Sequence, residues 1–437
     1  MKSNLAWHFS FCREAFGLVP TLFWFVVRPM MDLLRPSTWH FYRMDKGFKL
    51  PPKQGLRVML VASDCSQGSG AFRCCVGLAK TLRERNHLDV FVVTPWHGDG
   101  DVLLREASVP FVCIPSSDFI VSLKAELALS RSAQIAKFVR NILAVQNLRR
   151  TIRRLDVDIV HNNTSCIYVG ALAAFLEKRP LVWHFREYIT EGTKARIINE
   201  RMAYELMAKA NCILTVSDWV RGKFANVLPT GKLKTVHDGG DKSRFLRLEH
   251  VAATQSPMVF ISVGSYRDYK GYDELAHACV SLYKSGCRNF RICFVGKGCE
   301  ENLLKIFEKD GLRDLVEFCG FQREPVKFYE HADIAFTCCR AEAFGLVTVE
   351  SMLSGCCVIG ARAAATPELI RHGETGLLFE FTAGECPDLV EKMRYAIEHP
   401  EHVRRMAAAG RAYVCQGKTL EVNADKVAAV YRQIQKA

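Results

Sequence analysis

The chain has 437 residues, of which 49% are hydrophobic and 24% are charged, with 29 glycines and 15 prolines. This length allows two domains with full hydrophobic cores, and the composition excludes a disordered chain, a collagen-like repeat and a small disulfide-stapled scaffold. Lysine and arginine outnumber aspartate and glutamate by 59 to 46, and the resulting formal charge of +13 favours anionic partners: nucleic acid, phosphates or a membrane surface.

Two segments carry most of this positive excess. Residues 1–55 hold eight basic and three acidic side chains, and residues 121–155 hold eight basic and one acidic side chain. A nucleic-acid-binding enzyme more often spreads its basic groups around a groove and interleaves them with aromatic residues. The two localised segments therefore favour an anionic membrane surface, and we expect no nucleic-acid partner.

Residues 1–55 differ from the rest of the chain and are expected to form an N-terminal extension. Residues 16–27 are uncharged, include Pro20 and Trp24, and lie between Arg13 and Arg28. As a helix this run would rise about 18 Å, short of the roughly 30 Å hydrocarbon core, and no small-residue cleavage motif follows it. We expect a membrane-interfacial segment, with packing on the protein's own surface as the alternative.

The 18 cysteines form no C-x-x-C pair and no cysteine–histidine run with zinc spacing. Several of them lie inside apolar, strand-like runs, as Cys293 and Cys357 do. We therefore expect small buried side chains in a reducing compartment rather than a disulfide framework.

After residue 55, short apolar runs alternate with helix-like stretches in two series, which is typical of parallel α/β sheets. The first series predicts a glycine-containing loop at 65–70, a helix at 72–85, and strands at 56–63, 89–94, 158–161, 181–184 and 212–216. The second series predicts strands at 258–263, 291–295, 315–318, 333–337 and 356–359. The expected fold is α/β, with two Rossmann-like domains that face a cleft and bind ligands at the carboxyl ends of their strands.

The expected domain boundary lies in the turn-rich residues 237–257. It divides the chain into an N-terminal domain at 56–240 and a C-terminal domain at 241–437, with the last helix returning to the N-terminal domain. A basic amphipathic helix is expected at about 130–155, where apolar residues recur at three- and four-residue spacing. Its apolar face either packs on its own domain or docks on anionic lipid.

The most informative segment is residues 340–350, with the sequence RAEAFGLVTVE. A glycine after a strand lets backbone N–H groups approach an anion, and the N-terminus of the following helix favours negative charge. This arrangement suits a diphosphate. Glu342 and Glu350 accept hydrogen bonds when ionised, which suits the hydroxyl-rich sugars on either side of a diphosphate. The alternative for two glutamates at this spacing is a solvated helix face.

At this segment the chain resembles the retaining glycosyltransferases of family 4, which have the GT-B fold. The resemblance extends over residues 57–431. In the second half it includes VGSYRDYKG at 263–271, VGKGCE at 295–300, the stretch 318–333 and PELIRHGETGLL at 367–378. In the first half, the loop at 68–70, DIVHN at 158–162 and VWHFRE at 182–187 are similar to the family's acceptor-side domain.

The resemblance implies roles for the matching residues of the second half. Glu350 would bind the ribose of a nucleotide, and Glu342 would contact the transferred sugar. The Lys270 ammonium would help to hold the diphosphate. Arg267 is not part of the family pattern, but it lies two residues after Ser265 and is a further candidate to reach the same group. Backbone amides would hold the same diphosphate at Phe344, Gly345, Leu346 and Val347.

The resemblance also implies roles for residues of the first half. Gly68 and Gly70 would let the loop that carries them approach the same phosphates. His184 would lie near the reacting centre and the acceptor, and it would share the catalytic work with Glu342 and Lys270. A buried core histidine is the alternative for His184.

The sequence departs from the family pattern at two places. Ser265 stands where the family usually has arginine directly after the glycine of the phosphate-binding segment, and Ala364 and Ala365 stand where a glycine pair is common. These departures keep open a catalytically silent scaffold that binds nucleotide-sugars. A nucleotide-sugar epimerase, which can share this two-domain fold, is a further alternative.

The reaction that the resemblance implies is transfer of a hexose from a nucleotide-diphosphate sugar, UDP-sugar before GDP-mannose, with retention of configuration. The departing diphosphate would accept the acceptor's proton, while the protein supplies orientation and electrostatic stabilisation. Lys270 and backbone amides would replace a divalent metal, so neither a metal nor another cofactor is expected. The basic segments favour a glycan or lipid-linked acceptor and a cytoplasmic enzyme at the inner face of the membrane, in surface polysaccharide or glycolipid synthesis.

Overall fold

The structure is a computed structural model that describes residues 48–122, 131–193, 195–246, 257–298 and 300–436. These residues form two compact units. The first unit contains the described residues up to 216, residues 220–236 and the residues from 424 onward, and the second contains residues 217–219 and 237–423. Of the expected interfacial extension, residues 1–47 lie outside the described residues. No described helix is both long and apolar enough to cross a bilayer.

The first unit is built on a seven-stranded sheet in which all neighbouring strands are parallel. Its spatial order is β3 (Phe111–Cys113), β2 (Asp89–Thr94), β1 (Arg57–Val61), β5 (Ile159–Asn162), β6 (Leu181–Phe185), β8 (Cys212–Thr215) and β9 (Leu233–Thr235). Along the chain, β2 and β3 are added on one side of β1, and β5 is then placed on the other side of β1. The strand order therefore reverses between β1 and β5. A separate antiparallel pair joins β4 (Ile120–Ser122) to β7 (Ala195–Ile197).

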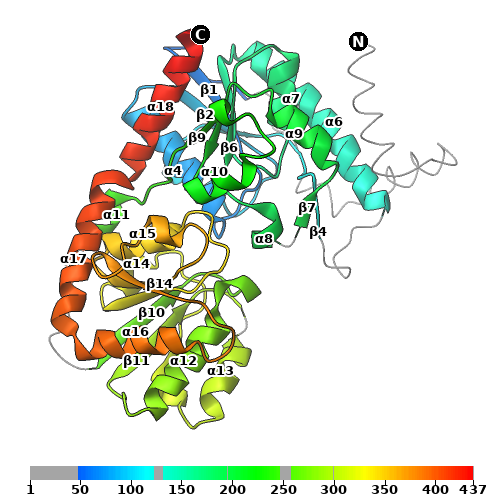
Figure 1. Ribbon diagram of the computed structural model, residues 1–437. Helices are drawn as coiled ribbons and strands as arrows, with labels where there is room; N and C mark the ends of the chain where they lie inside the picture. Colours follow the sequence, from blue (N-terminus) through cyan, green and yellow to red (C-terminus); the bar gives the residue numbers. More distant parts are fainter. Residues whose placement is uncertain (1–47, 123–130, 194, 247–256, 299, 437) are drawn as a thin grey trace. The chain divides into compact units, whose positions relative to one another are not determined.

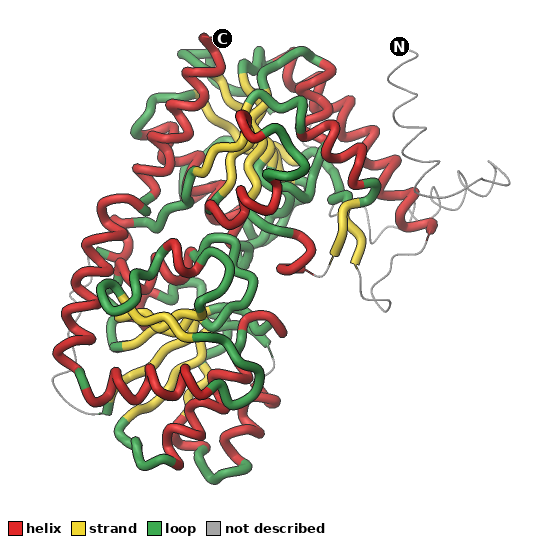
Figure 2. The backbone as a smooth tube through the Cα atoms, in the orientation of Figure 1, coloured by secondary structure: helices red, strands yellow, loops and turns green. Residues whose placement is uncertain are grey.

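Helices cover both faces of this sheet, as the red and yellow segments of Figure 2 show. In chain order they are α4 (Gly70–Glu84), α5 (Asp101–Glu106), α6 (Arg131–Arg154), α7 (Val169–Leu176), α8 (Ile189–Thr193), α9 (Glu200–Met207), α10 (Asp218–Phe224) and η3 (Thr230–Lys232). The last helix, α18 (Leu420–Lys436), belongs to the first unit from Ala424 onward.

The core of the first unit includes the end of the chain. Leu60 of β1 and Val92 of β2 belong to one buried cluster with residues of α4 and with Val427 and Tyr431 of α18. On the surface, Arg85 at the end of α4 forms an ion pair with Asp425 of α18, at 2.8 Å. Residues more than 300 positions apart therefore build a single core, beside the strands labelled β1 and β2 in Figure 1.

Helix α6 corresponds to the expected basic amphipathic helix, and the apolar face of its second half packs on its own domain. Val145, Leu148 and Ile152 are fully or almost fully buried. Arg149 and Arg153 of the same helix both bind the carboxylate of Glu177, at 2.6 Å each. Part of the helix's positive charge is therefore neutralised within the unit.

The second unit is built on a six-stranded sheet that is also parallel throughout. Its spatial order is β12 (Val316–Phe318), β11 (Phe290–Val295), β10 (Met258–Val263), β13 (Ile334–Thr337), β14 (Cys357–Ala361) and β15 (Gly376–Phe379). The strand order reverses between β10 and β13. The helices are α11 (Lys242–Phe245), η4 (Asp268–Lys270), α12 (Tyr272–Lys284), α13 (Glu300–Glu308), η5 (Arg313–Leu315), α14 (Val326–Tyr329), α15 (Leu346–Leu353), η6 (Thr366–Glu368), α16 (Pro387–Glu398) and α17 (Pro400–Gly417).

The prediction of two Rossmann-like domains is confirmed, because each unit has a parallel sheet between helices and a point where the strand order reverses. In open sheets of this kind ligands bind outside the carboxyl ends of the strands at that point. We therefore expect a site at the residues that follow two strands in each unit, which are β1 and β5 in the first unit and β10 and β13 in the second.

Candidate functional site

In the second unit, the loop after β13 leads directly into helix α15. Gly345 is the N-cap of this helix and has a φ of 101°, in the left-handed region that favours glycine. A Cβ at this position would lie 3.1 Å from Leu369 Cδ1 and 3.2 Å from Thr348 Oγ1. Because a glycine N-cap has no side chain to bind the first N–H groups of α15, they are available for an anion, which the helix dipole also favours.

A lysine and a glutamate meet at the point where the strand order reverses. Lys270 ends η4, which follows β10, and Glu342 lies in the loop that follows β13. Their charged atoms are 2.7 Å apart. The two loops are also joined by a backbone hydrogen bond from Arg340 N–H to the carbonyl oxygen of Tyr269, at 2.8 Å. Residues 72 positions apart are therefore held together at the carboxyl edge of the sheet.

Electrostatics keep both members of this pair charged. Burial alone would lower the pKa of Lys270, but the Glu342 carboxylate outweighs burial and holds this pKa above its usual range. Burial alone would raise the pKa of Glu342, but the Lys270 ammonium outweighs burial and holds this pKa below its usual value. Both side chains keep some exposure to solvent, at 27% for Lys270 and 21% for Glu342, so a ligand can reach them.

Glu342 also lies beside the start of α15. A Cβ built on Gly345 would be 3.5 Å from Glu342 Cγ, so the ion pair and the helix N-terminus are neighbours. Glu350 lies one helical turn beyond Leu346, on the same side of α15, and is only 3% exposed. The predicted residues Lys270, Glu342 and Gly345 therefore come together here, and α15 carries Glu350.

The other predicted residues of the second unit differ in exposure. Phe344 is buried, and its ring centroid lies 5.9 Å from that of His237. Leu346 and Val347 are partly exposed in the first turn of α15, and the role of their amides toward a diphosphate stays a prediction. Arg267 is exposed at the start of η4, and its role toward a diphosphate stays a prediction.

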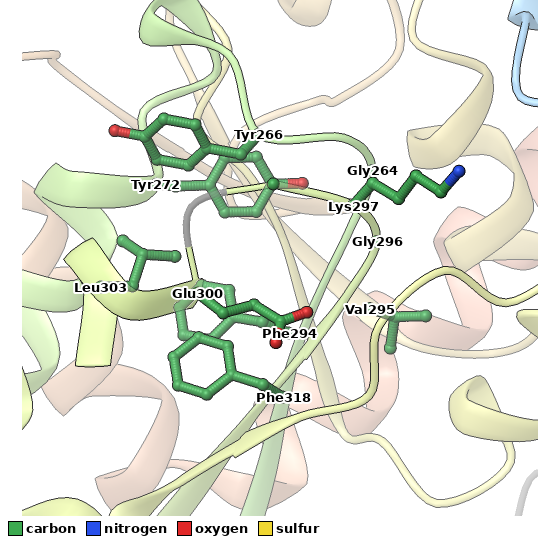
Figure 3. Close-up of a pocket in the computed structure, with 11 residues that line it drawn as sticks. Gly264, Tyr266, Tyr272, Phe294, Val295, Gly296, Lys297, Glu300, Leu303 and Phe318 are labelled. Atoms are coloured by element: carbon green, nitrogen blue, oxygen red, sulfur yellow. The ribbon is translucent and has the colours of Figure 1, made fainter.

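Figure 3 shows a small pocket between the carboxyl ends of β10, β11 and β12. Its rim includes Gly264 and Gly296, from the two glycine-containing motifs after β10 and β11. A Cβ on Gly296 would lie 1.8 Å from the carbonyl oxygen of Gly264, so this close approach of two loops requires glycine. Tyr266 lines the same pocket and donates a hydrogen bond to Asp273, at 2.9 Å.

His184 lies in the core of the first unit. It is on β6 and is fully buried, with its ring centroid 5.3 Å from that of His161. Neither ring nitrogen of His184 has a hydrogen-bond partner among the described residues. Burial, with the positive charge of Arg186, holds the pKa of His184 well below its usual value, so the imidazole is neutral. Its predicted role near an acceptor stays a prediction.

The loop that carries Gly68 and Gly70 follows β1 and opens α4. Both glycines are exposed, and a Cβ on Gly70 would meet no atom within 4 Å. Ser69 between them is the N-cap of α4: its Oγ accepts a hydrogen bond from Phe72 N–H and donates one to Asp64. The loop's own packing therefore does not require glycine at position 70.

A polar cluster in the first unit was not predicted as part of the site. Arg186 donates from Nε to Asn163 Oδ1 at 3.0 Å, and Glu187 accepts hydrogen bonds from the backbone and hydroxyl of Ser165, at 2.8 Å each. Burial raises the pKa of Glu187. These residues follow the apolar runs of β5 and β6. Polar residues after such runs are the pattern in the sequence that could have identified them.

The comparisons with known proteins cover most of the chain. Residues 248–413 match the family described as "Glycosyl transferases group 1", and residues 68–244 match the one described as "Glycosyltransferase Family 4". The chain is 23% identical, over 48% of its length, to N-acetyl-alpha-D-glucosaminyl L-malate synthase of Bacillus anthracis, of which 54% is covered. It is 32% identical, over 60% of its length, to a sulfoquinovosyl transferase of Arabidopsis thaliana, of which 54% is covered.

The chain thus spans about half the length of these curated relatives. Among solved structures, it is similar to the Anabaena protein Alr3699/HepE, crystallised in complex with UDP and glucose. The TM-score is 0.70 and the identity 21%, over 87% of this chain and 100% of that one. At this identity the likeness establishes the fold.

Proposed function

The chain belongs to the group 1 glycosyltransferases of family 4, and on that premise we propose that it transfers a hexose from a nucleotide-diphosphate sugar. The acceptor is a glycan or a lipid-linked molecule, and the anomeric configuration of the sugar is retained. The observation that carries the proposal is the Lys270–Glu342 pair beside the glycine-capped N-terminus of α15. A UDP-sugar is the favoured donor, which agrees with the UDP bound in the Anabaena structure.

The Lys270–Glu342 pair can act on both parts of such a donor. An ammonium group has three N–H donors, and only one is needed for Glu342, so Lys270 keeps donors for the diphosphate oxygens. Glu342 accepts through two oxygens and keeps capacity for a sugar hydroxyl. The first N–H groups of α15 add a further positive region for the diphosphate, and Glu350 on the same helix binds the ribose hydroxyls.

In the proposed reaction, the bond between the anomeric carbon and the diphosphate oxygen breaks as the acceptor oxygen bonds to the same face of that carbon. The acceptor's proton passes to the departing diphosphate, so the protein needs no separate base. Negative charge grows on the leaving diphosphate, and Lys270 with the helix N-terminus stabilises it. Donors fixed in advance at such a position typically contribute about 3–4 kcal/mol to lowering the barrier.

Thermal unfolding with UDP, GDP and ADP tests the nucleotide site. A ligand that binds only the native state stabilises it by about 2.7 kcal/mol at a hundredfold excess over its Kd. We expect a rise in Tm for one nucleotide, lost in Glu350→Gln and kept in Glu308→Gln, whose side chain is exposed on α13. If no nucleotide at millimolar concentration shifts the Tm of the wild type, the proposed donor site is wrong.

A product analysis separates transfer from the alternatives. With the nucleotide-sugar that the Tm assay selects, a transferase releases nucleoside diphosphate and places labelled sugar in the acceptor fraction. An epimerase leaves the nucleotide attached and changes the donor's stereochemistry. A silent scaffold gives a Tm shift without either product.

Peripheral attachment to the inner, cytoplasmic face of a membrane is the second part of the proposed function. It is supported by an exposed surface on α6 and α7, where Leu143 is 59% and Phe175 is 48% exposed. Arg150 and Arg154 are exposed on the same helix as Leu143. Apolar side chains flanked by arginine suit the headgroup region of anionic lipid.

Vesicle sedimentation tests this attachment. We expect the chain to bind vesicles that contain phosphatidylglycerol more strongly than vesicles of phosphatidylcholine alone, and to do so less well as salt rises. The variant Arg150→Glu/Arg154→Glu should reduce binding by about thirtyfold or more, because each of the two basic residues near the surface contributes about 1 kcal/mol. Lys284→Glu, which changes an exposed lysine of the second unit, serves as the control. Equal binding to both lipids would contradict the attachment.

A further inference from the structure

Two cysteines and a glutamate share one face of the second sheet at its edge. Cys293 lies on β11, Glu317 lies opposite it on β12, and Cys319 follows the end of β12. Along β11, Phe290, Ile292 and Phe294 point into the buried core, so Cys293 points to the other face. Cys293 and Cys319 are both partly exposed.

The two sulfur atoms are already in contact. Cys293 Sγ and Cys319 Sγ are 3.0 Å apart, although the residues are 26 positions apart in sequence. A disulfide bond is about 2.05 Å long, so the sulfurs need to approach by about 1 Å. The backbone holds this geometry, because Cys319 N–H donates to the carbonyl oxygen of Phe294 at 2.9 Å and Gly296 N–H donates to that of Gly320 at 2.8 Å.

The same group also has the composition of a metal site, since one ligand atom from each of Cys293, Glu317 and Cys319 lies within 4.8 Å of the others. A structural zinc site uses four protein ligands, and this group offers three among the described residues. Burial raises the pKa of both thiols, so we expect their exchange with a small disulfide to be slow.

We propose that Cys293 and Cys319 are a redox-sensitive thiol pair, which a small disulfide such as oxidised glutathione converts to an intramolecular disulfide between β11 and the end of β12. One protein thiol loses its proton and attacks the small disulfide, and one small thiol leaves with a proton. The second protein thiol then attacks the mixed disulfide and releases the other small thiol. Two protein thiols are oxidised, and one small disulfide is reduced to two thiols.

The bond would act on the pocket of Figure 3. Val295 and Gly296 of β11 and its loop, and Phe318 of β12, line that pocket and lie within three positions of the two cysteines. As the edge strand of its sheet, β12 pairs with β11 alone. A covalent link to β11 would therefore prevent this strand from opening and would fix the distance between two walls of the pocket.

Peptide mapping tests the proposal, because trypsin places the relevant cysteines on separate peptides. Residues 292–297 carry Cys293, residues 298–305 carry Cys299 and residues 314–323 carry Cys319. The full chain is equilibrated with oxidised glutathione, free thiols are alkylated, and the non-reduced digest is examined by mass spectrometry. We expect a disulfide-linked pair of peptides 292–297 and 314–323. This pair should account for most of the Cys319 in the digest and should disappear on reduction.

Variants and a metal measurement complete the test. Cys319→Ser should remove the linked pair, whereas Cys415→Ser, which changes a partly exposed cysteine of α17, should leave it unchanged. The wild type alone is sufficient if Cys319→Ser fails to fold. Alkylation or glutathionylation of both cysteines without a cross-link would overturn the proposal. One equivalent of zinc in the wild type, lost in Cys293→Ser, would also overturn it and identify a metal site.

Discussion

Polar side chains at the strand ends bind one another in both units, but in the second unit the paired side chains lie beside a helix N-terminus that no side chain caps. Arg186 binds Asn163, and Glu187 binds Ser165, all after β5 and β6. After β10 and β13 of the second unit, the structure has instead a partly exposed lysine–glutamate pair and a glycine-capped helix. The two sheets share a topology, so their loops account for the difference.

The difference extends to how each sheet buries charge. His161 and His184 of the first unit are fully buried, neutral rings, and His161 Nδ1 lies 2.6 Å from the hydroxyl of Tyr431. Lys270 and Glu342 of the second unit are both charged because each stabilises the other. The first unit therefore buries two neutral imidazoles, whereas the second unit holds two opposite charges in a partly exposed position.

The largest expected effect is on catalysis, from Lys270→Met. This variant removes the positive charge that is proposed to stabilise the departing diphosphate, so kcat/KM should fall by about 10²–10³-fold. Steady-state kinetics with the selected nucleotide-sugar measures this loss. Lys284→Met is the matched control, because Lys284 also forms an ion pair in the second unit, with Asp310 at 2.6 Å, but on the surface.

Lys284→Met should change kcat/KM by less than twofold, since exposed ion pairs contribute little. A loss below tenfold in Lys270→Met would show that the helix N-terminus alone holds the diphosphate. The Lys270–Glu342 pair would then have only a structural role, like the polar contacts at the strand ends of the first unit.

A smaller effect, on stability, is expected from acid. Burial, followed by the charge of Arg186, holds the pKa values of His161 and His184 well below the usual 6.5. Because the unfolded chain takes up protons below pH 6.5 and the folded chain does not, stability is full above that pH and falls as pH decreases. Each histidine contributes a loss of about 1.4 kcal/mol per pH unit.

Urea unfolding at pH 7.5, 6.5 and 5.5 measures this slope. His184→Leu should reduce the slope by about half of the histidine contribution and should not destabilise the unit at pH 7.5, because no described residue bonds its ring nitrogens. His277→Gln changes an exposed histidine of α12 and should leave the slope as it is. An unchanged slope in His184→Leu would show that His184 is already protonated or solvated in the folded state.

The smallest effect separates the two glycine loops. Gly345→Ala places a Cβ on a residue with a φ of 101° and within 3.2 Å of two side-chain atoms, so we expect a loss of about 1–2 kcal/mol. Gly70→Ala adds a Cβ with no atom within 4 Å and should change stability by less than about 0.5 kcal/mol. Thermal unfolding compares the two variants. Equal losses would mean that the loop of the first unit is as constrained as that of the second.

Much of the fold could be predicted from the sequence, because its central strands are long apolar runs. The runs expected at 89–94 and 258–263 coincide with β2 and β10. The strands β3, β9 and β15 were not predicted. They have three or four residues each and lie at the edges of their sheets, where each pairs with a single neighbouring strand.

The candidate site could be predicted in part. The glycine before α15 and the charged residues Lys270 and Glu342 could be singled out, because they lie in loops that follow apolar strands, where parallel sheets bind their ligands. Their ion pair could not be predicted, since it depends on β10 and β13 being neighbours. The burial of His184 could not be predicted either, because both faces of β6 are covered and alternation along that strand carries no information.

The path of the chain through the first unit sets an order of assembly. The core of this unit contains Val427 and Tyr431, whereas the segment that ends at residue 236 contributes all its strands. A ribosome that adds about 5–20 residues per second makes the intervening 237–423 in about 10–40 s. During that time the sheet of the first unit exists without the α18 residues that cover it, and the whole second unit emerges before they do. The first unit therefore begins to be translated before the second unit, but its core is completed after the second unit has been made.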